Sequence, residues 1–348
     1  MASTLTRVRR VLTAAAAAAA CIVIATATLP AQAPVLIKMA TLVPDGSSWH
    51  LVLKEVAAQW GKVSAGRVKV NLYAGGSAGD DPGVVLKMNL GTLNAAVLSS
   101  VGVAEIDKSV YALSLPMAYN DDEEVYYVLG KMRPRLEANM LARGFVVLNW
   151  ADGGWVQFFA QKPVATPDDL RKLKLFSWAG DPKSTEIWQS AGFNPVALPS
   201  TELATSLQTG LTQAFSAPPQ VAALTNYYAN ANNMTDMRWA LMLGATVIKK
   251  DAWARIPAEL QPQLLKIAQD AGAKLQDAIR KSRDADVAAM KTKGLNVVTV
   301  DAATFEMWRK TAESLYPKIR GVLVPADAFD DALRYRDEYR TQQAAAKK

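Results

Sequence analysis

The sequence predicts an α/β protein of two domains that are braced by one long helix. Short apolar segments alternate with longer amphipathic ones along most of the 348 residues, a pattern typical of α/β layers with a largely parallel sheet. The chain is longer than one typical domain requires. One amphipathic stretch, 257–293, is too long to pack inside a single small domain.

Short apolar runs with strand-like composition recur between turn signals. A helix, 49–64, follows the first of these runs, and Gly75-Gly76 indicates a tight turn after the second. Asp80-Asp81-Pro82 then resembles a helix start, because Asp caps a helix and Pro suits its first turn. The expected strands are 35–41, 68–73, 95–98, 145–150 and 173–177.

The long amphipathic stretch carries apolar residues such as Leu260, Leu264 and Ile267 at three- or four-residue steps, with charges between them. Pro257 suits its first turn and Gly294 its end. At ~1.5 Å per residue, such a helix reaches on the order of 50 Å, so we expect it to contact both domains. The expected organisation is domain I at 34–152 plus about 240–256, domain II at 153–239 plus about 295–330, the bridging helix at 257–294, and a loosely docked tail helix at 331–348.

The first 33 residues have the layout of a secretory signal peptide. Arg7, Arg9 and Arg10 precede an apolar run, 11–27, and small residues with A-x-A spacing follow. We therefore expect cleavage and a periplasmic location. A retained anchor is the alternative, because the apolar run approaches the length that spans a bilayer. The only cysteine, Cys21, lies in this run, so the mature chain is expected to contain no thiol or disulfide.

The composition excludes several function classes. The net charge of +7 includes the signal arginines, and the remaining Lys and Arg are interspersed with Asp and Glu, so we expect no nucleic-acid partner. One histidine and no mature cysteine leave no common zinc site. The acidic clusters 80–81 and 121–124 lack calcium-loop spacing and are better explained as charges at helix N-termini. We expect no metal and no other cofactor.

One segment matches a catalytic motif. Gly75-Gly76-Ser77-Ala78-Gly79 fits the nucleophile elbow of serine hydrolases. That fold needs a histidine late in the chain, whereas the only histidine, His50, precedes the serine. We therefore expect no enzyme, and a hydrolase using Ser77 stays as an alternative.

Several short motifs follow one another along the chain. They are G-R-V-K-V at 66–70, Y-A-G-G-S-A-G at 73–79, G-T-L-N at 91–94, L-P-M at 115–117, K-P-V-A-T-P-D-D-L at 162–170, L-K-L at 173–175, T-E-L at 201–203 and L-Q-T-G at 207–210. In this order they resemble the motifs of the extracytoplasmic solute receptors of tripartite ATP-independent periplasmic (TRAP) transporters. The resemblance implies a periplasmic-binding-protein-like fold that closes over a small-molecule ligand. It also implies delivery to a permease of small and large membrane subunits, driven by an ion gradient; amphipathic cargo would add a further periplasmic carrier protein.

The chain departs from this family at the positions that hold a carboxylate. The arginine that follows the K-I pair of acid-binding members falls on Phe176, a second arginine falls on Val156, and an asparagine falls on Ala217. A buried carboxylate without a partner costs several kcal/mol. The resemblance therefore implies a ligand other than a small dicarboxylate.

Aromatic residues occupy the same neighbourhoods, so we expect an apolar or amphipathic ligand. The alternatives are a small organic acid bound through Ser47, Ser48, Lys174 or Arg238, and a scaffold with an empty cleft. The expected ligand-binding residues are Ser47, Ser48, Trp49, Met117, Trp155, Val156, Phe176, Trp178, Phe215, Ser216 and Ala217.

Overall fold

A computed structural model describes residues 33–346, and the chain from Val35 onward forms one compact unit. The predicted signal peptide lies outside the described residues except at its last position. Within 33–346, none of the helices has the length and apolarity that a membrane crossing requires.

One continuous set of strands runs through this unit in the order β2-β1-β3-β9-β4-β7-β5-β6, with β8 attached to β4 and β10 attached to β8. The predicted strands at 35–41, 68–73 and 95–98 are present with those bounds. The strands are β1 Val35–Thr41, β2 Val68–Tyr73, β3 Ala95–Leu98, β4 Phe145–Ala160, β5 Lys174–Trp178, β6 Asn194–Leu198, β7 Ala214–Ala217, β8 Asn233–Thr235, β9 Ala240–Lys249 and β10 Asn296–Val298.

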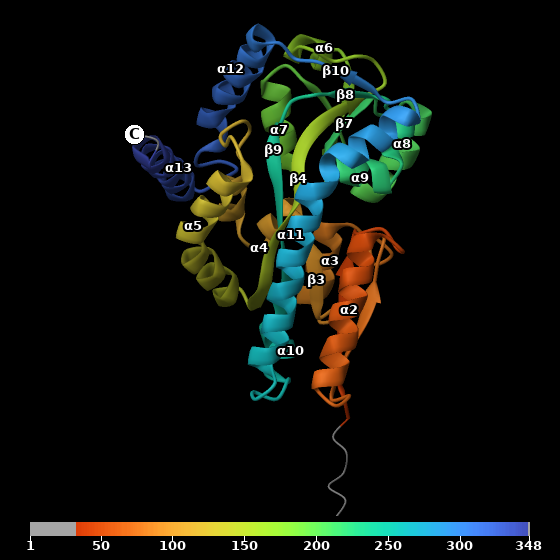
Figure 1. Cartoon of the computed structure of the whole chain (residues 1–348), viewed down its shortest axis with the longest axis vertical. Helices are drawn as coiled ribbons and strands as arrows, with labels where there is room; N and C mark the ends of the chain where they lie inside the picture. Colours follow the sequence, from red (N-terminus) through yellow and green to blue (C-terminus); the bar gives the residue numbers. More distant parts are fainter. Residues whose placement is uncertain (1–32, 347–348) are drawn as a thin grey trace, which may run out of the picture. The chain divides into compact units, whose positions relative to one another are not determined.

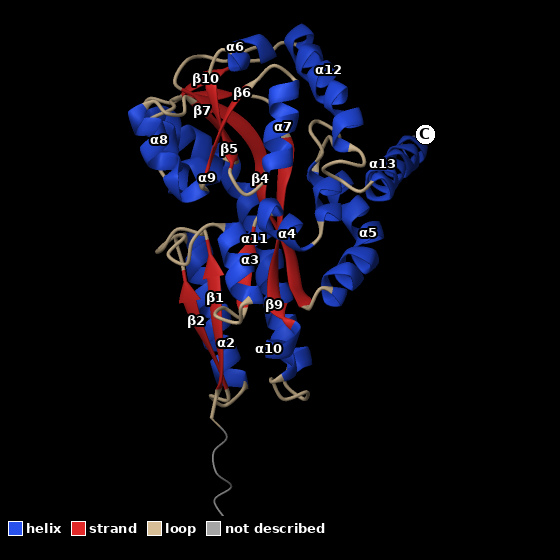
Figure 2. Cartoon of the chain, turned by 180° about the vertical axis from the view of Figure 1, so that it is seen from behind, coloured by secondary structure: helices blue, strands red, loops and turns tan. Residues whose placement is uncertain are grey.

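Two strands, β4 and β9, pass through both halves of the unit (Figures 1 and 2). We call the half with β1, β2 and β3 lobe I and the half with β5 to β8 and β10 lobe II. The ladder between β4 and β9 is irregular between Asp152 and Trp155, and beyond it β4 pairs with β7 and β8 of lobe II. The proposed domain boundary after residue 152 falls at this irregularity.

The sheet is mixed, which corrects the expectation of a largely parallel one. The pairs β1–β2, β1–β3, β5–β6, β5–β7 and β8–β10 are parallel, whereas every pair through β4 or β9 is antiparallel. The chain reverses direction in the long strands that link the lobes, and the apolar pattern alone does not encode that reversal.

Helices cover the faces of the sheet. The helices are α2 Ser48–Val63, α3 Asp81–Asn89, α4 Ser100–Ile106, α5 Asp122–Ala142, α6 Pro167–Arg171, α7 Pro182–Ser190, α8 Leu203–Thr209, α9 Pro219–Leu224, α10 Lys250–Ala254, α11 Gln261–Thr292, α12 Ala302–Ile319 and α13 Ala326–Ala346, with 3₁₀ turns η1 Lys108–Ser114, η2 Ser200–Glu202 and η3 Tyr227–Ala229.

The predicted bridging helix is confirmed as α11, which contacts both lobes (Figure 1). Leu264 near its start packs with the core of lobe I, and Met290 near its end packs with lobe II residues such as Phe159. The helix begins at Gln261 with a proline in its first turn, four residues later than the sequence indicated.

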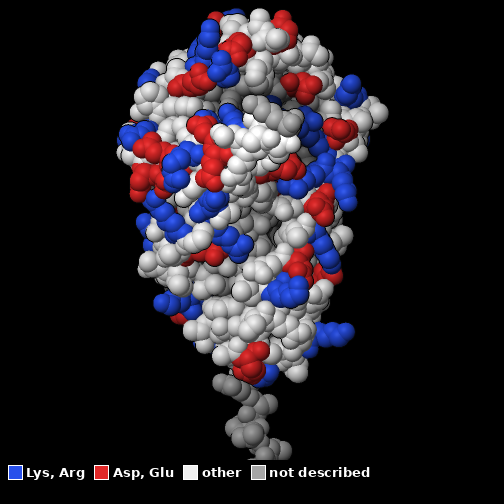
Figure 3. All heavy atoms as spheres, turned by 60° about the vertical axis from the view of Figure 1, so that its left-hand side comes forward, with Lys and Arg blue, Asp and Glu red and all other residues white. Residues whose placement is uncertain are grey.

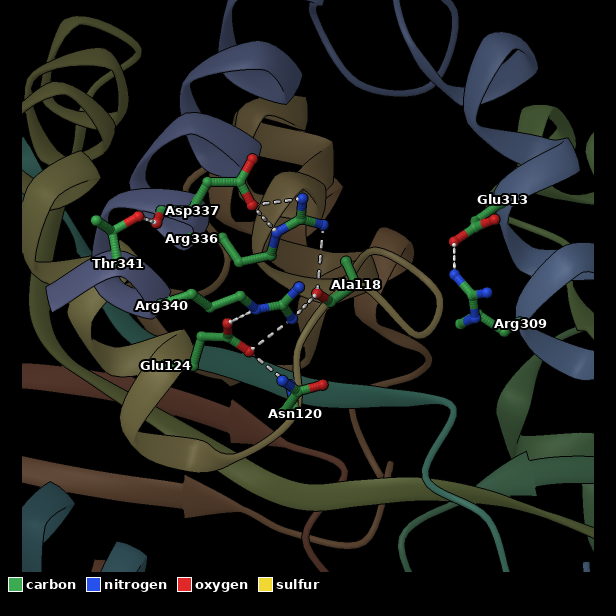
Figure 4. Close-up of polar contacts among 9 residues, drawn as sticks. All are labelled: Ala118, Asn120, Glu124, Arg309, Glu313, Arg336, Asp337, Arg340 and Thr341. Atoms are coloured by element: carbon green, nitrogen blue, oxygen red, sulfur yellow. Dashed lines mark hydrogen bonds and ion pairs between the residues drawn. The ribbon is translucent and has the colours of Figure 1, made fainter. Parts of the chain in front are cut away.

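The last helix, α13, begins at Ala326, before the expected tail. It packs on α5 with Ala328, Phe329 and Ala332 buried. Arg340 also pairs with Glu124 of α5 and donates to the Ala118 carbonyl oxygen (Figure 4).

Candidate functional site

A cavity of about 330 Å³ lies where the two lobes meet. Lobe I supplies its wall from β1, β3 and α2, while lobe II supplies β5, β7 and α9. The strands β4 and β9 and the helix α11 complete the wall. The volume is roughly twice that of the ~150 Å³ apolar cavity known to hold benzene. We call it the main cavity.

The main cavity extends into lobe I between α2, α11 and the sheet. Trp60 of α2 lines this end, and its indole Nε1 donates to the Leu264 carbonyl oxygen at 3.1 Å. The facing residues of α11 are small, namely Ala268, Ala271 and Gly272. Ala268 and Ala271 place only methyl groups against the cavity, whereas Gly272 allows the helix to approach β4 closely, because a Cβ at this position would lie 3.1 Å from the Asn149 side chain.

Among the described residues, the main cavity has one charged side chain in its wall, Asp152. Its carboxylate accepts from the Tyr126 hydroxyl at 2.5 Å and from the Gly154 backbone N–H at 2.9 Å. Burial raises the pKa of Asp152 above its usual value. A ligand carboxylate in this cavity would be repelled by the like charge of Asp152, and none of the described lining residues is a cation that could pair with it.

Most polar groups on the wall are already bonded within the protein. The Asn149 amide donates to the Ala268 carbonyl oxygen at 2.7 Å, and its oxygen accepts from the Thr246 hydroxyl at 3.0 Å. The Ser99 hydroxyl donates to Asp81 at 2.7 Å. The indole Nε1 of Trp49 is an exception, since it is buried without a partner among the described residues. The wall therefore offers little to an ionised ligand.

A second cavity of about 190 Å³ shares part of this wall. The two cavities have Ser99, Phe176, Trp178, Ser216 and Met242 in common. Hydroxyl-bearing residues make up a larger share of the lining of the second cavity than of the main cavity, although the main cavity also has several. Its polar lining residues are Ser99, Ser100, Tyr111, Ser114, Ser177, Asp181, Ser184 and Ser216.

Direct contacts join the two lobes beside these cavities. Asp80 at the start of α3 accepts from the backbone N–H of Ser200 at 3.0 Å and from its hydroxyl. The Tyr111 hydroxyl donates to Asp181 at 2.7 Å. A Cβ on Gly180 would lie 2.2 Å from a carbon of Pro82, so only glycine allows the approach at this point.

Six of the residues expected to bind ligand line a cavity. Phe176 and Trp178 lie on β5 with ring centroids 6.5 Å apart, and both face the two cavities. Ser216 of β7 also lines both cavities. Trp49 and Ala217 line the main cavity, and Val156 lines the second one.

The other five expected residues lie away from both walls. The Ser47 hydroxyl caps α2 by accepting from the His50 N–H, and neighbouring Ser48 is exposed. Phe215 stacks on Phe159 in the core of lobe II, with centroids 5.1 Å apart. The last two of the five, Trp155 and Met117, also lie outside the described walls of both cavities.

Trp155 donates from its indole Nε1 to Asp122 at 2.6 Å, and the Arg238 guanidinium covers its ring at 5.4 Å. The backbone N–H of Met117 donates to the Trp239 carbonyl oxygen at 2.6 Å. These contacts are made within the protein, and both residues lie outside the described walls of the two cavities.

The donors proposed for an organic acid are not brought together. Ser47, Ser48, Lys174 and Arg238 are all absent from the described walls of both cavities, and the last two are exposed. Likewise, His50 lies in the first turn of α2, where its Nδ1 accepts from the Gly46 backbone N–H and lies 2.8 Å from Asp45. Among residues 33–346, no three metal-ligating side chains cluster.

Sequence reasoning missed the lobe I end of the main cavity, including Leu53, Trp60, Ala271 and Leu275. One signal was present, because the apolar stripe of the long helix carries Ala271 and Gly272 at its centre, where larger residues would pack. The open space at the lobe I end depends on how α11 packs against α2 and the sheet, and a local sequence pattern does not contain that information.

The chain resembles proteins of known class in both sequence and fold. The family model described as bacterial extracellular solute-binding protein, family 7 (DctP) matches residues 39–321. The 2,3-diketo-L-gulonate-binding periplasmic protein YiaO of Escherichia coli is 24% identical over 254 residues, 72% of this chain and 77% of that protein.

Two solved structures illustrate the likeness in fold. A TRAP periplasmic solute-binding protein from Ralstonia eutropha with bound (S)-2-acetolactate has a TM-score of 0.81 at 20% identity, covering 87% of this chain and 99% of that one. One from Sulfurospirillum deleyianum with bound succinate has a TM-score of 0.79 at 18% identity, covering 87% and 98%. With its family model matched over most of its length, the chain belongs to the bacterial extracellular solute-binding proteins of family 7, which are receptors for solutes and not enzymes.

Proposed function

We propose that this protein is a periplasmic TRAP receptor that captures a small apolar or amphipathic ligand in the main cavity and delivers it to an ion-gradient-driven permease. The observation that carries the proposal is the charge of the wall. Both lobes and α11 contribute to it, yet its one charged residue among those described is the carboxylate Asp152.

The energetics of such a wall favour apolar surface. Burial gains about 25 cal/mol for each Å² of apolar ligand area removed from water. A ligand carboxylate would instead lose its hydration and lie near the Asp152 carboxyl group. Burial already raises the pKa of Asp152. Without a guanidinium or ammonium partner, that desolvation costs several kcal/mol. Phe176 lines the main cavity. By the resemblance described above, acid-binding members of the family have an arginine at this position.

The similar proteins named above carry acids: a diketo-gulonate, an acetolactate and a succinate. Those ligands belong to those proteins. The chain shares their fold at an identity low enough for pocket chemistry to differ, and the charge of the wall supports a different ligand class here.

The ligand is tested by isolating the protein from its native host, extracting it with organic solvent and identifying the co-purified molecules by mass spectrometry. We expect an uncharged or amphipathic compound that is depleted from Phe176→Arg and retained by Ser77→Ala, whose side chain is exposed and lies outside both cavities. Recovery of a short dicarboxylate at one molecule per protein would overturn the ligand class.

The permease is tested by pull-down from native membranes. We expect both membrane subunits to be retained by the ligand-loaded receptor, because closure joins the rims of both lobes through contacts such as Asp80 to Ser200. The additional periplasmic carrier stays a prediction that the same pull-down tests. Failure to recover any permease subunit in either ligand state would contradict the transport role.

A further inference from the structure

We infer that the ligand is an elongated amphiphile, with an alkyl chain that follows the main cavity into lobe I and an uncharged, hydroxyl-bearing head in the second cavity. The inference rests on the proposed function and adds the shape and chemical class of the ligand.

The two cavities are neighbours with a common wall. Five residues line both, and they include Phe176 and Trp178 of β5, Ser216 of β7 and Met242 of β9. A ligand in the main cavity that passes these side chains therefore reaches the second cavity directly. The two adjacent cavities have walls of different chemistry, with a larger share of hydroxyl-bearing residues in the second.

One end of this space is suited to an alkyl chain. Beyond the wall shared with the second cavity, the main cavity continues under α11 to Leu53 and Trp60, lined by aliphatic and aromatic groups. The Trp60 indole N–H already donates to the Leu264 carbonyl oxygen, so it needs no hydrogen-bond acceptor from a ligand. A volume about twice that of a benzene-sized cavity accommodates on the order of 12 carbon atoms.

The other end is suited to an uncharged donor. Among the described residues that line the second cavity, Asp181 carries the one charge. Its two oxygens accept from the Tyr111 hydroxyl and from the Ser184 backbone N–H, which leaves further lone pairs free. A hydroxyl head can donate to such a carboxylate, whereas an anionic head would be repelled by it.

The first test is a calorimetric titration of delipidated protein with straight-chain primary alcohols of increasing length, below their aggregation limits. We expect affinity to rise about fourfold with each methylene until the chain fills the lobe I end, then to level off. The carboxylate of matched length should bind at least tenfold more weakly. Affinity that stops rising at four carbons, or a carboxylate that equals its alcohol, overturns the inference.

The second test uses two blocking variants with different signatures. Ala271→Leu fills the lobe I end and should weaken the longest alcohol at least tenfold while changing the shortest one less than threefold. Ala273→Leu, on the exposed side of the same helix, is its control. Ser184→Leu narrows the second cavity and should weaken alcohols of every length, with exposed Gln189→Leu as its control.

The outcomes separate this inference from the proposed function. If short alcohols bind and neither blocking variant matters, the elongated ligand is wrong and the apolar receptor stands. If carboxylates bind and no alcohol does, both fail.

Discussion

The carboxylates in the walls of the two cavities differ in their partners from those at the interface between α5 and α13. Asp152 and Asp181 line the cavities beside tyrosine hydroxyls and backbone N–H groups. Across the α5–α13 interface, Glu124 is paired with Arg340, and Glu338 with Lys131 (Figure 4 shows the first pair). Among the described residues, cations therefore pair with carboxylates at the α5–α13 interface, whereas no Lys or Arg lines either cavity.

The pKa directions follow this difference. Burial raises the pKa of Asp152 and raises that of Asp81, which lies behind Ser99 of the cavity wall, to about 6. On α13, the Tyr127 hydroxyl and the Lys131 ammonium lower the pKa of Glu338, and a backbone N–H and the Arg135 guanidinium lower that of Asp327.

Cations are therefore not scarce in this protein; they are located outside the cavities. On the face shown in Figure 3, Lys and Arg alternate with Asp and Glu over the surface. The chain has 39 Lys and Arg residues, yet none of those in the described range lines either cavity, which supports the proposal of an uncharged ligand.

The largest effect is expected from placing a cation in the cavity. Phe176→Arg exchanges a buried aromatic ring for a guanidinium in a wall that offers it poor solvation, so affinity for a medium-chain alcohol should fall at least ~100-fold. Phe176→Leu keeps the wall apolar and should stay within about fivefold. Titration calorimetry of both variants measures the effect, and a tenfold or smaller loss in the arginine variant would contradict the account.

The next effect tests a carboxylate that lacks a cation. Burial raises the pKa of Asp81 from its ordinary value of 3.8 to about 6, so between about pH 4 and pH 6 the folded protein binds a proton that the unfolded chain has released. Stability attributable to this group therefore falls as pH rises through that window.

The Asp81→Asn substitution removes this pH-dependent loss of stability, and the amide oxygen of the new side chain can still accept a hydrogen bond from Ser99. Its stability relative to the parent protein should increase by up to about 3 kcal/mol from pH 4 to pH 7. Denaturant unfolding at four pH values measures this, and parallel pH profiles for the two proteins would refute it.

A smaller effect is expected at the paired carboxylate. Arg340→Ala leaves Glu124, whose side chain is 1% exposed, without its guanidinium. Because Arg340 itself is 39% exposed, we expect a loss of about 2 kcal/mol, below the range for fully buried pairs. Urea unfolding measures it, and Glu124→Gln combined with Arg340→Ala should recover part of the loss.

The smallest effect is the surface control. Arg309 pairs with Glu306 and Glu313 along one exposed helix face (Figure 4 shows the second pair). Exposed pairs of this kind contribute little, so Arg309→Ala should leave the melting temperature unchanged. A shift as large as that of Arg340→Ala would show that the two regions do not differ in the way described.

The sequence predicted the fold better than the site, for physical reasons. Strand bounds and the long helix follow from local periodicity, which is why β1 to β3 and α11 were predictable. Positional resemblance pointed to Phe176 and Ala217, and both line the main cavity. Trp155 and Phe215 instead have partners within the protein, namely the Asp122 carboxylate and the Phe159 ring. The lobe I end of the cavity arises where three distant elements leave a gap, and no local pattern contains it.

If the main cavity accepts no anion, a short dicarboxylate should not bind to the protein. Ligand-free protein is titrated with succinate in a calorimeter at neutral pH and low salt, where any attraction to a hidden cation would be strongest. The account predicts no saturable heat up to millimolar succinate. A one-to-one isotherm with a micromolar or lower Kd would contradict it.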